Sequence, residues 1–280
     1  FITVWHRRAG KDKTWLNFVV KESQRRVGNY YYYFPTLSLG RKILWQGVDK
    51  AGMPFFDHIP TQLVVRKRHD EMRVELRNGS AIQVMGTDRL DVVGPNPIGC
   101  VFSEFSLQNP SAWNYIRPIL AENDGWAGFN FTPRGFNHAY RLHQMAQDNP
   151  AWWVSALTVD DTGAISQQAI EDERRAGMSE ELIQQEFFIS YEYGLEGAYY
   201  LKQLARARRE DRIAPIPWHT APVYTAWDIG KGDGTAVIFF QVVGFNVLIV
   251  DAYFNAGEGV EHSAQKLQEK SRERGFVYAH

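Results

Sequence analysis

The first candidate for chemistry is a basic loop near the start of the chain, Trp5-His6-Arg7-Arg8-Ala9-Gly10-Lys11-Asp12. It lies between an apolar, β-prone run over residues 1–5 and a stretch with helical periodicity over residues 13–26. A helix N-terminus offers free N–H groups to phosphate, and Lys11 can reach the β- and γ-phosphates of a nucleotide. The match to the P-loop pattern is incomplete, because Trp5 replaces the first glycine and Asp12 replaces the hydroxyl residue. The alternative is an ordinary basic turn capped by Asp12. The predicted nucleotide-binding residues are Ala9, Gly10, Lys11, Asp12, Lys13 and Thr14.

The second candidate is an acid at the end of an apolar run, Gly99-Cys100-Val101-Phe102-Ser103-Glu104. In ATPases with this layout, a glutamate at the end of a strand polarises the attacking water. The residue before it is usually an aspartate that supports magnesium, and here it is Ser103. A solvated acid or a helix cap is the alternative interpretation of Glu104.

The two departures from the usual pattern become informative together. The loop has Asp12 where a hydroxyl is usual, and the strand has Ser103 where an aspartate is usual. One carboxylate and one hydroxyl therefore remain, on exchanged elements, and magnesium takes oxygen ligands of both kinds. We interpret the pair as a compensating exchange that holds one Mg²⁺. The alternative is that both positions have decayed and the site is inactive.

A third candidate lies late in the chain, where Asp228 ends the β-prone run Tyr224-Thr225-Ala226-Trp227 and Asp233 follows in the same turn. A strand, an aspartate, a turn and a second strand are how a ribonuclease-H-like fold begins. Its first aspartate holds two Mg²⁺ or Mn²⁺ ions that activate water. Asp-x-Gly is also common in hairpins, so an ordinary turn is the alternative. Asp251 ends the next strand and is left out of this predicted site.

The elements around these residues alternate between strands and helices, which predicts an α/β fold with a mainly parallel sheet and helices on both faces. Asn78-Gly79 predicts a hairpin between two strands. A charged helical pattern covers residues 166–188, and a proline cluster around Trp218 indicates a linker or domain entry. The predicted strands cover residues 1–5, 30–34, 64–65, 72–76, 81–85, 98–102, 126–131, 223–227, 235–243 and 247–253, and the predicted helices include 13–26, 112–120 and 259–274.

The amino-acid composition limits the classes of protein to which this chain can belong. The 280 residues are 44% hydrophobic and 14% aromatic, which is typical of a globular protein and excludes a disordered chain. A single cysteine, Cys100, excludes a disulfide framework and favours a reducing compartment. The net charge of -1 does not indicate a static binder of nucleic acid, and a motor that grips and releases DNA need not be strongly basic. No apolar run is long enough to cross a bilayer, so no membrane partner is expected. The first residue is Phe1 and the last run ends in mid-pattern, so we expect a fragment that lacks both ends.

In this order, the motifs resemble those of the large terminase subunit of tailed bacteriophages. His6 to Lys11 resembles the family's arginine-bearing phosphate loop, and Val101-Phe102-Ser103-Glu104 resembles its acidic strand. Phe131-Thr132-Pro133-Arg134-Gly135 is similar to its coupling motif, and Trp227-Asp228-Ile229-Gly230 to the first strand of its nuclease. Two further matching segments lie between these motifs, Phe34-Pro35-Thr36 with Arg41-Lys42 and Trp45, and Asn78-Gly79-Ser80 with Gly86-Thr87-Asp88.

The resemblance implies a role for each matching residue. Gly10 and Lys11 would bind ATP, Arg7 or Arg8 would contact its γ-phosphate, and Glu104 would activate water. Thr132 would sense hydrolysis and couple it to movement, and Asp228 and Asp233 would hold nuclease metals. The family's trans-acting arginine corresponds to Val93 here, and Arg89 is the nearest substitute.

The resemblance also implies a fold and a function. The fold is a P-loop ATPase of the additional-strand type over residues 1–195, followed by the first part of a ribonuclease-H-like nuclease over residues 196–280. The function is ATP-driven translocation of double-stranded DNA into a procapsid, with metal-dependent cutting of concatemers. Expected partners are DNA, the portal ring, a small terminase subunit and sister subunits in a ring, in the host bacterial cytoplasm. The alternatives are a catalytically inactive prophage remnant and a P-loop helicase or repair ATPase.

Overall fold

The computed structural model describes residues 1–88, 96–192, 200–216, 219–230, 234–255 and 259–279. The chain divides into two compact units, Phe1–Arg206 and Ala207–His280, which are described separately. The division falls within helix α8 (Leu201–Arg209), whereas the sequence predicted a boundary after residue 195. In the described ranges, no helix is long and apolar enough to span a membrane.

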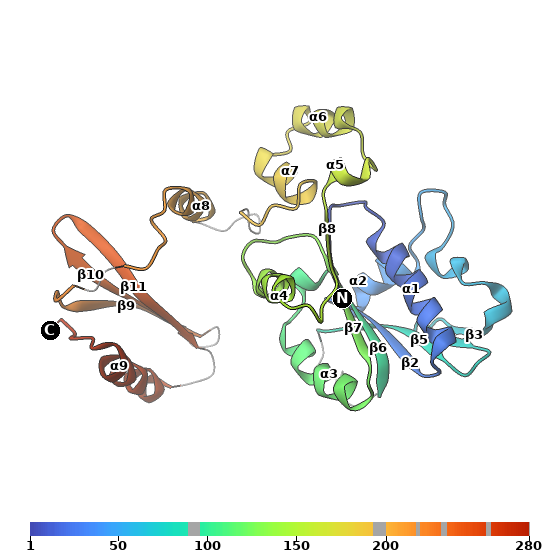
Figure 1. Cartoon of the computed structure of the whole chain (residues 1–280), viewed down its shortest axis with the longest axis horizontal. Helices are drawn as coiled ribbons and strands as arrows, with labels where there is room; N and C mark the ends of the chain where they lie inside the picture. Colours follow the sequence, from blue (N-terminus) through green and yellow to red (C-terminus); the bar gives the residue numbers. More distant parts are fainter. Residues whose placement is uncertain (89–95, 193–199, 217–218, 231–233, 256–258, 280) are drawn as a thin grey trace. The chain divides into compact units, whose positions relative to one another are not determined.

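The first unit is built on one mixed sheet, which has eight strands in the described part of the chain (Figure 1). Its strand order is β3-β4-β5-β2-β6-β7-β1-β8, and the strands from β5 to β8 are parallel neighbours. The strands are β1 (Ile2–Trp5), β2 (Asn29–Phe34), β3 (Val64–Arg68), β4 (Arg73–Leu76), β5 (Ala81–Gly86), β6 (Pro97–Ser103), β7 (Trp126–Phe131) and β8 (Val154–Leu157).

Strand β7 lies between β1, which leads into the basic loop, and β6, which ends at Ser103. An extra strand between these two defines the additional-strand type of P-loop fold, so the sequence-based fold class is confirmed for this unit. Parallel strands place their carboxyl ends at one edge of the sheet, and binding sites of open α/β folds lie at that edge. The ends of β1, β6 and β7 therefore position the candidate site.

Strand β2 shows how the sequence produces two buried faces. Its sequence is Asn-Tyr-Tyr-Tyr-Tyr-Phe, and successive side chains point to opposite faces of a strand. Tyr30, Tyr32 and Phe34 pack in the core beneath helix α1, whereas Tyr31 and Tyr33 pack in the core beneath α3 and α4. A nearly continuous apolar run is expected of a parallel strand covered on both sides.

Helices cover both faces of this sheet, as predicted. They are α1 (Lys11–Arg25), α2 (Leu37–Gly40), α3 (Ser111–Glu122) and α4 (His138–Gln147). A π-helix at Arg41–Trp45 and 3₁₀ turns at Phe55–His58, Thr61–Leu63 and Phe105–Leu107 complete the unit. A small helical cap with its own apolar core contains α5 (Val159–Thr162), α6 (Gln167–Arg175) and α7 (Glu180–Glu186).

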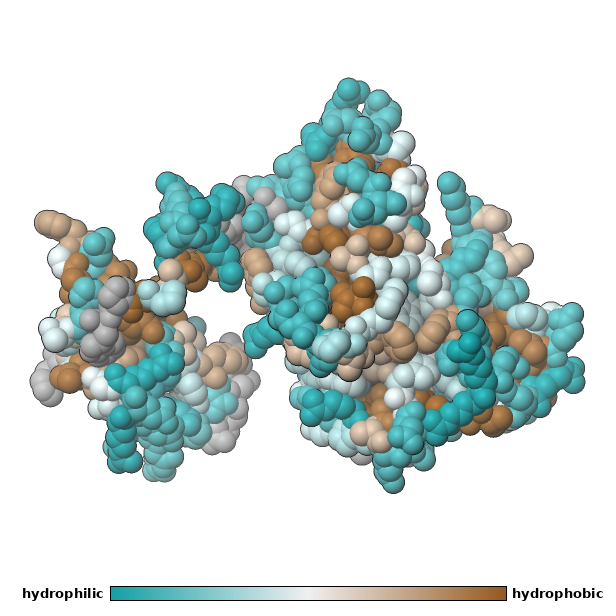
Figure 2. Space-filling model, viewed as in Figure 1, coloured by the Kyte–Doolittle hydropathy of each residue, from teal (hydrophilic) through white to brown (hydrophobic). Residues whose placement is uncertain are grey.

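The second unit contains an antiparallel sheet, three-stranded in the described residues, of order β11-β10-β9. Its elements are β9 (Val223–Ile229), β10 (Thr235–Val243), β11 (Asn246–Asn255) and α9 (Val260–Arg274). Val223, Val237, Phe239 and Phe276 form the buried core. After α9 the chain returns to the sheet, where Tyr278 forms a parallel bridge with Val223. Hydrophobic residues are visible on the surface of this unit (Figure 2). Its exposed hydrophobic residues include Ile229, Val247, Ile249 and Phe254.

Candidate nucleotide-binding site

The basic loop joins the end of β1 to the start of α1, as predicted. Arg8 (φ 67°) and Gly10 (φ 78°) both adopt left-handed backbone conformations, which turn the chain sharply into the helix. Gly10 occupies the N-cap position, and no side chain caps the helix. The first turn of α1 therefore presents N–H groups that no side chain satisfies, which is the arrangement that binds phosphate at helix N-termini.

Lys11, the first residue of α1, is buried with its ammonium at the carboxyl ends of two neighbouring strands. Its Nζ donates hydrogen bonds to the carbonyl oxygens of Trp5 (3.2 Å) and His6 (3.3 Å), and to the Thr132 hydroxyl (2.9 Å). The structure thus brings together two predicted site residues, Lys11 and Thr132, that are 121 positions apart.

Asp12 and Ser103 also meet. The Ser103 hydroxyl donates to Oδ1 of Asp12 at 2.7 Å across 91 positions of sequence. Two residues that the sequence did not single out complete the group, because Tyr32 OH donates to the same oxygen at 2.8 Å and Asn130 Nδ2 approaches it at 3.4 Å. Burial, and the adjacent Asp12 carboxylate, raise the pKa of Tyr32 well above its ordinary value, so Tyr32 remains a donor.

Glu104 follows Ser103 in a left-handed conformation (φ 54°) and is partly buried. Burial raises its pKa, while the positive charges of Lys11 and Arg134 oppose that shift. The predicted general base is therefore a carboxyl group with a raised pKa at the end of β6, within electrostatic reach of Lys11.

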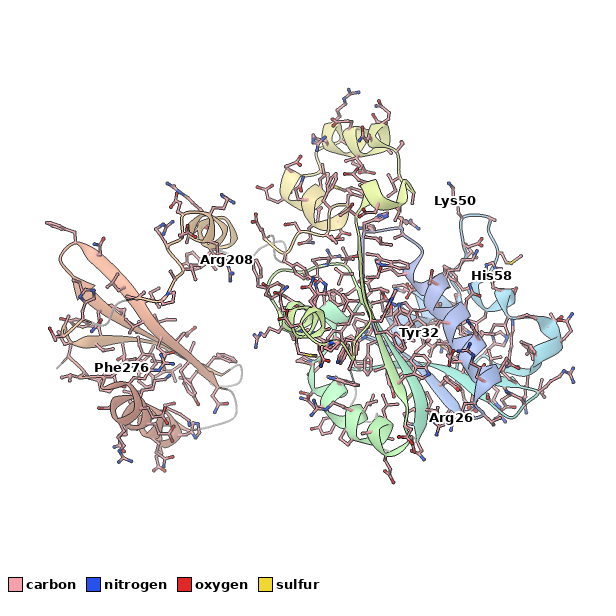
Figure 3. The ribbon with its side chains drawn as sticks, viewed as in Figure 1. Arg26, Tyr32, Lys50, His58, Arg208 and Phe276 are labelled. Carbon is pink, nitrogen blue, oxygen red and sulfur yellow. The ribbon has the colours of Figure 1, made fainter. Side chains whose placement is uncertain are left out.

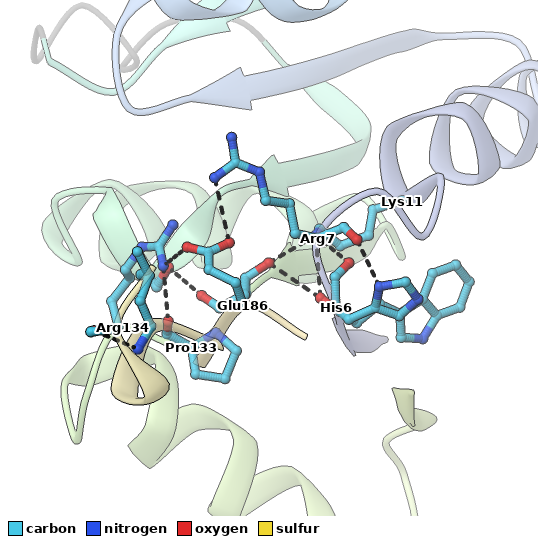
Figure 4. Close-up of polar contacts among 11 residues, drawn as sticks. His6, Arg7, Lys11, Pro133, Arg134 and Glu186 are labelled. Carbon is cyan, nitrogen blue, oxygen red and sulfur yellow. Dashed lines mark hydrogen bonds and ion pairs between the residues drawn. The ribbon is translucent and has the colours of Figure 1, made fainter. Parts of the chain in front are cut away.

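Glu186 connects the helical cap to this site (Figure 4). This buried carboxylate lies between two arginines, forming an ion pair with Arg134 of the predicted coupling motif and a longer one with Arg7 at 3.8 Å. The backbone N–H of Arg7 also donates to the Glu186 carbonyl oxygen at 2.7 Å. Sequence reasoning missed Glu186, because an acid within a charged helical pattern carries no signal of its own.

His6 was predicted as part of the loop but without a role of its own, and it joins the loop to α5. Its side chain is fully buried, with Nδ1 2.6 Å from the Arg7 carbonyl oxygen and Nε2 2.6 Å from the Thr162 hydroxyl. Burial lowers the pKa of His6, which favours the neutral ring. The loop is therefore held on one side by the strand ends and on the other by the cap.

The remaining predicted residues of the loop lie at its margin. Arg8 and Thr14 are exposed, and Ala9 is partly buried with its N–H donating to the His6 carbonyl oxygen. Lys13 forms an ion pair with Asp49 at 2.8 Å, and Asp49 also contacts His58. Arg89 and Val93, the candidate positions for the trans-acting arginine, lie outside the described residues.

Thr132 links the lysine to α4 through hydrogen bonds. The Ser106 hydroxyl donates to the Thr132 carbonyl oxygen (2.9 Å), and Asn137 Nδ2 donates to the Ser106 carbonyl oxygen (2.8 Å). Asn137 caps α4 by accepting from the N–H of Ala139. The segment from Thr132 to Asn137 is thus hydrogen-bonded to Lys11 at one end and to helix α4 at the other.

The candidate nuclease residues, Asp228 and Asp233, lie in the second part of the chain. Asp228 is exposed on β9 opposite Ala236 of β10, and Asp233 lies outside the described residues. Asp251, which the sequence analysis left out of this site, forms ion pairs with Lys270 and Arg274. Within the ranges that the structure describes, no cluster of three or more His, Cys, Asp or Glu residues is arranged to hold a metal.

Solved structures share this fold. The Thermus phage P74-26 large terminase ATPase domain aligns with a TM-score of 0.57 and 17% identity, covering 68% of this chain and 87% of that one. The large terminase of a thermophilic bacteriophage, solved in complex with ADP, aligns with a TM-score of 0.54 and 16% identity, covering 97% of this chain and 68% of that one. The same phage terminase in complex with ATP-gamma-S gives the same TM-score at 15% identity, with 97% and 68% covered.

No protein-family model matches the chain, and no curated protein matches its sequence. At 15–17% identity, the likeness to these solved structures shows the fold alone, which this chain shares with phage large terminases. The resemblance predicted from the motifs is confirmed at this level.

Proposed function

We propose that residues 1–195 form the ATP-hydrolysing motor of a phage DNA-packaging terminase. The observation that carries this proposal is the convergence of Lys11, Asp12, Ser103, Glu104 and Thr132 at the carboxyl ends of β1, β6 and β7. A cation for the phosphates, oxygen ligands for Mg²⁺, a base for the attacking water and a residue that couples hydrolysis to movement would then lie at the same edge of the sheet. The chain's fold is also that of terminases whose structures contain ADP or ATP-gamma-S.

In this proposal the loop from Ala9 to Thr14 holds the phosphates of ATP. Lys11 neutralises the β- and γ-phosphates, and Arg7 or Arg8 contacts the γ-phosphate. Glu104 accepts a proton from the attacking water. Thr132, hydrogen-bonded to Lys11 and connected to α4, passes the change at the γ-phosphate to the rest of the unit.

Asp12 and Ser103 would hold Mg²⁺. Their donor set fits this ion, because carboxylate and hydroxyl oxygens are the hard ligands that Mg²⁺ takes. When bound, the ion neutralises charge that develops on the phosphate oxygens. The 2.7 Å hydrogen bond between the two side chains supports a compensating exchange over a decayed site.

The second part of the proposal concerns residues 196–280, which would form the beginning of a ribonuclease-H-like nuclease. Support comes from the antiparallel order β11-β10-β9, the helix α9 that follows, and the parallel bridge of Tyr278 with Val223 beside β9. Asp228 and Asp233 would then contribute to a two-metal site for Mg²⁺ or Mn²⁺.

As a packaging motor, the protein would act on double-stranded DNA in the host bacterial cytoplasm. It would assemble as a ring of sister subunits on the portal, with a small terminase subunit. It would cut concatemeric DNA through the nuclease.

Nucleotide binding and hydrolysis by the purified chain test the motor proposal. Lys11→Ala should weaken both ATP binding and turnover, because a cation on the phosphates is lost. Glu104→Gln should bind ATP normally but lose turnover by about 100-fold or more, since an amide cannot accept the proton. Lys21→Ala is the matched control, because Lys21 is an exposed lysine of the same helix. Wild-type turnover in Glu104→Gln would contradict the assignment.

A further inference from the structure

The hydrogen bonds to Asp12 are unevenly shared between its two carboxylate oxygens. Oδ1 accepts from Ser103 Oγ, Tyr32 OH and Asn130 Nδ2, at 2.7, 2.8 and 3.4 Å. Among the described residues, no side chain donates a hydrogen bond to Oδ2 of Asp12. One oxygen is thus saturated by protein donors, and the other remains available to a ligand.

The three donors come from three different strands. Tyr32 belongs to β2, Ser103 ends β6 and Asn130 belongs to β7, and all three side chains are buried. Asn130 also accepts from the Ser103 hydroxyl at 3.2 Å, and it donates to Tyr32 OH at 3.4 Å. The rigid sheet therefore holds the donors in place relative to one another.

Tyr32 is fully buried in the core beneath α1 (Figure 3). On the same face of β2, Tyr30 donates through its hydroxyl to the carbonyl oxygens of Arg26 (2.6 Å) and Glu22 (3.1 Å) at the end of α1. Two equivalent tyrosines therefore contact opposite ends of one helix. Of these two, it is Tyr32 whose hydroxyl reaches the predicted metal-binding carboxylate.

A carboxylate at this position needs such support more than a hydroxyl does. A serine or threonine at the helix start has one side-chain torsion to fix, whereas aspartate has a second, broad torsion about the bond to its carboxylate. Hydrogen bonds from outside the coordination sphere fix the orientation of metal ligands and are important for affinity.

We infer that Tyr32 is a positioning residue for a divalent cation. Its hydroxyl, together with Asn130, holds Oδ1 of Asp12, which leaves Oδ2 as the carboxylate oxygen that would bind the cation, with Ser103 as the second ligand of the proposed site. This inference rests on the proposed nucleotide site and deepens it, because it assigns the coordinating atom and the residue that orients it.

Metal binding measured apart from turnover tests the inference. Mn²⁺ serves as the probe, and its free concentration is followed by electron paramagnetic resonance in the presence of the full chain and saturating ADP. Tyr32→Phe should weaken Mn²⁺ binding about tenfold, which is the lower end of the loss expected when a residue that orients a metal ligand is removed. ADP affinity in excess EDTA should stay at the wild-type value, because the loop and Lys11 are unchanged.

Tyr30→Phe is the matched control, since it removes one buried hydroxyl from the same face of the same strand. It should leave Mn²⁺ affinity unchanged. Wild-type Mn²⁺ affinity in Tyr32→Phe would overturn the inference, and so would an equal loss in Tyr30→Phe. A loss of ADP affinity in EDTA would also overturn it, because Tyr32 would then support the loop as a whole.

Two further measurements keep the result interpretable. If Tyr32→Phe fails to fold in thermal melting, Asn130→Ala removes a second donor to the same oxygen and should weaken Mn²⁺ binding in the same way. Wild-type Mn²⁺ affinity in that variant would contradict the inference. Failure of the wild-type chain to bind ADP at all would instead refute the proposed function, and the inference with it.

Discussion

Removing the charge of Glu186 tests how the helical cap is held to the basic loop between β1 and α1. The Glu186 side chain is 4% exposed and pairs with Arg134, whose side chain is 18% exposed. Glu186→Gln keeps the size of the side chain but removes the carboxylate from beside a mostly buried guanidinium. Removing one partner of a buried ion pair costs about 3–5 kcal/mol. Because Arg134 is partly exposed, the free energy of unfolding should fall by about 3 kcal/mol.

The second arginine provides an internal comparison. Arg7 lies 3.8 Å from Glu186, and its side chain is 61% exposed, so solvent screens the pair. Exposed pairs contribute about 0–1 kcal/mol, and Arg7→Gln should therefore lower the free energy of unfolding by less than about 1 kcal/mol. The backbone hydrogen bond from Arg7 to Glu186 is retained in both variants.

Urea denaturation followed by tryptophan fluorescence measures these losses. Seven of the nine tryptophans belong to Phe1–Arg206, so the signal reports mainly on the first unit. Glu173→Gln is the control, because Glu173 is an exposed acid on α6 of the same cap. A loss below about 1 kcal/mol in Glu186→Gln, or equal losses in Glu186→Gln and Arg7→Gln, would refute the reasoning from burial.

Asp12→Ser and Ser103→Asp should each weaken Mg²⁺-dependent nucleotide binding, and the double variant should recover it; additive losses would show that the two residues share no ion. The 280-residue chain should nick supercoiled plasmid poorly with Mn²⁺. A two-metal site needs several converging carboxylates, and the Asp251 carboxylate is already paired with Lys270 and Arg274. Robust, chelator-sensitive cutting that is abolished by Asp228→Asn would disprove this prediction. Gly128→Ala should destabilise the first unit by about 1–3 kcal/mol, because the added carbon would lie 2.2 Å from the Trp15 ring. A wild-type melting temperature in this variant would contradict the packing argument.

Local patterns in the sequence were sufficient for most of the strands. The runs at 126–131 and 235–243 were predicted with the observed bounds, since β-branched and aromatic residues were bounded by turn residues. The helical pattern over 166–188 proved to be two helices, α6 and α7, because Gly177 (φ 100°) ends the first and Ser179 caps the second. Strand β8 and helix α4 were missed, and α4 is rich in polar residues.

The sequence by itself determined the basic loop between β1 and α1, the acid at the end of β6 and the order of the elements between them. Those features depend on neighbours in the chain, where strand propensity, helix periodicity and turn chemistry act over a few residues. The contacts of the candidate site, in contrast, join residues that are far apart in the sequence. Asp12 meets Ser103, Tyr32 and Asn130 only because β2, β6 and β7 lie side by side beneath α1. Glu186 reaches Arg7 and Arg134 only because the cap folds back onto the loop. Tertiary structure decided these partners, because parallel strands bring distant residues to one edge of the sheet and buried polar groups are stabilised only when such partners are present.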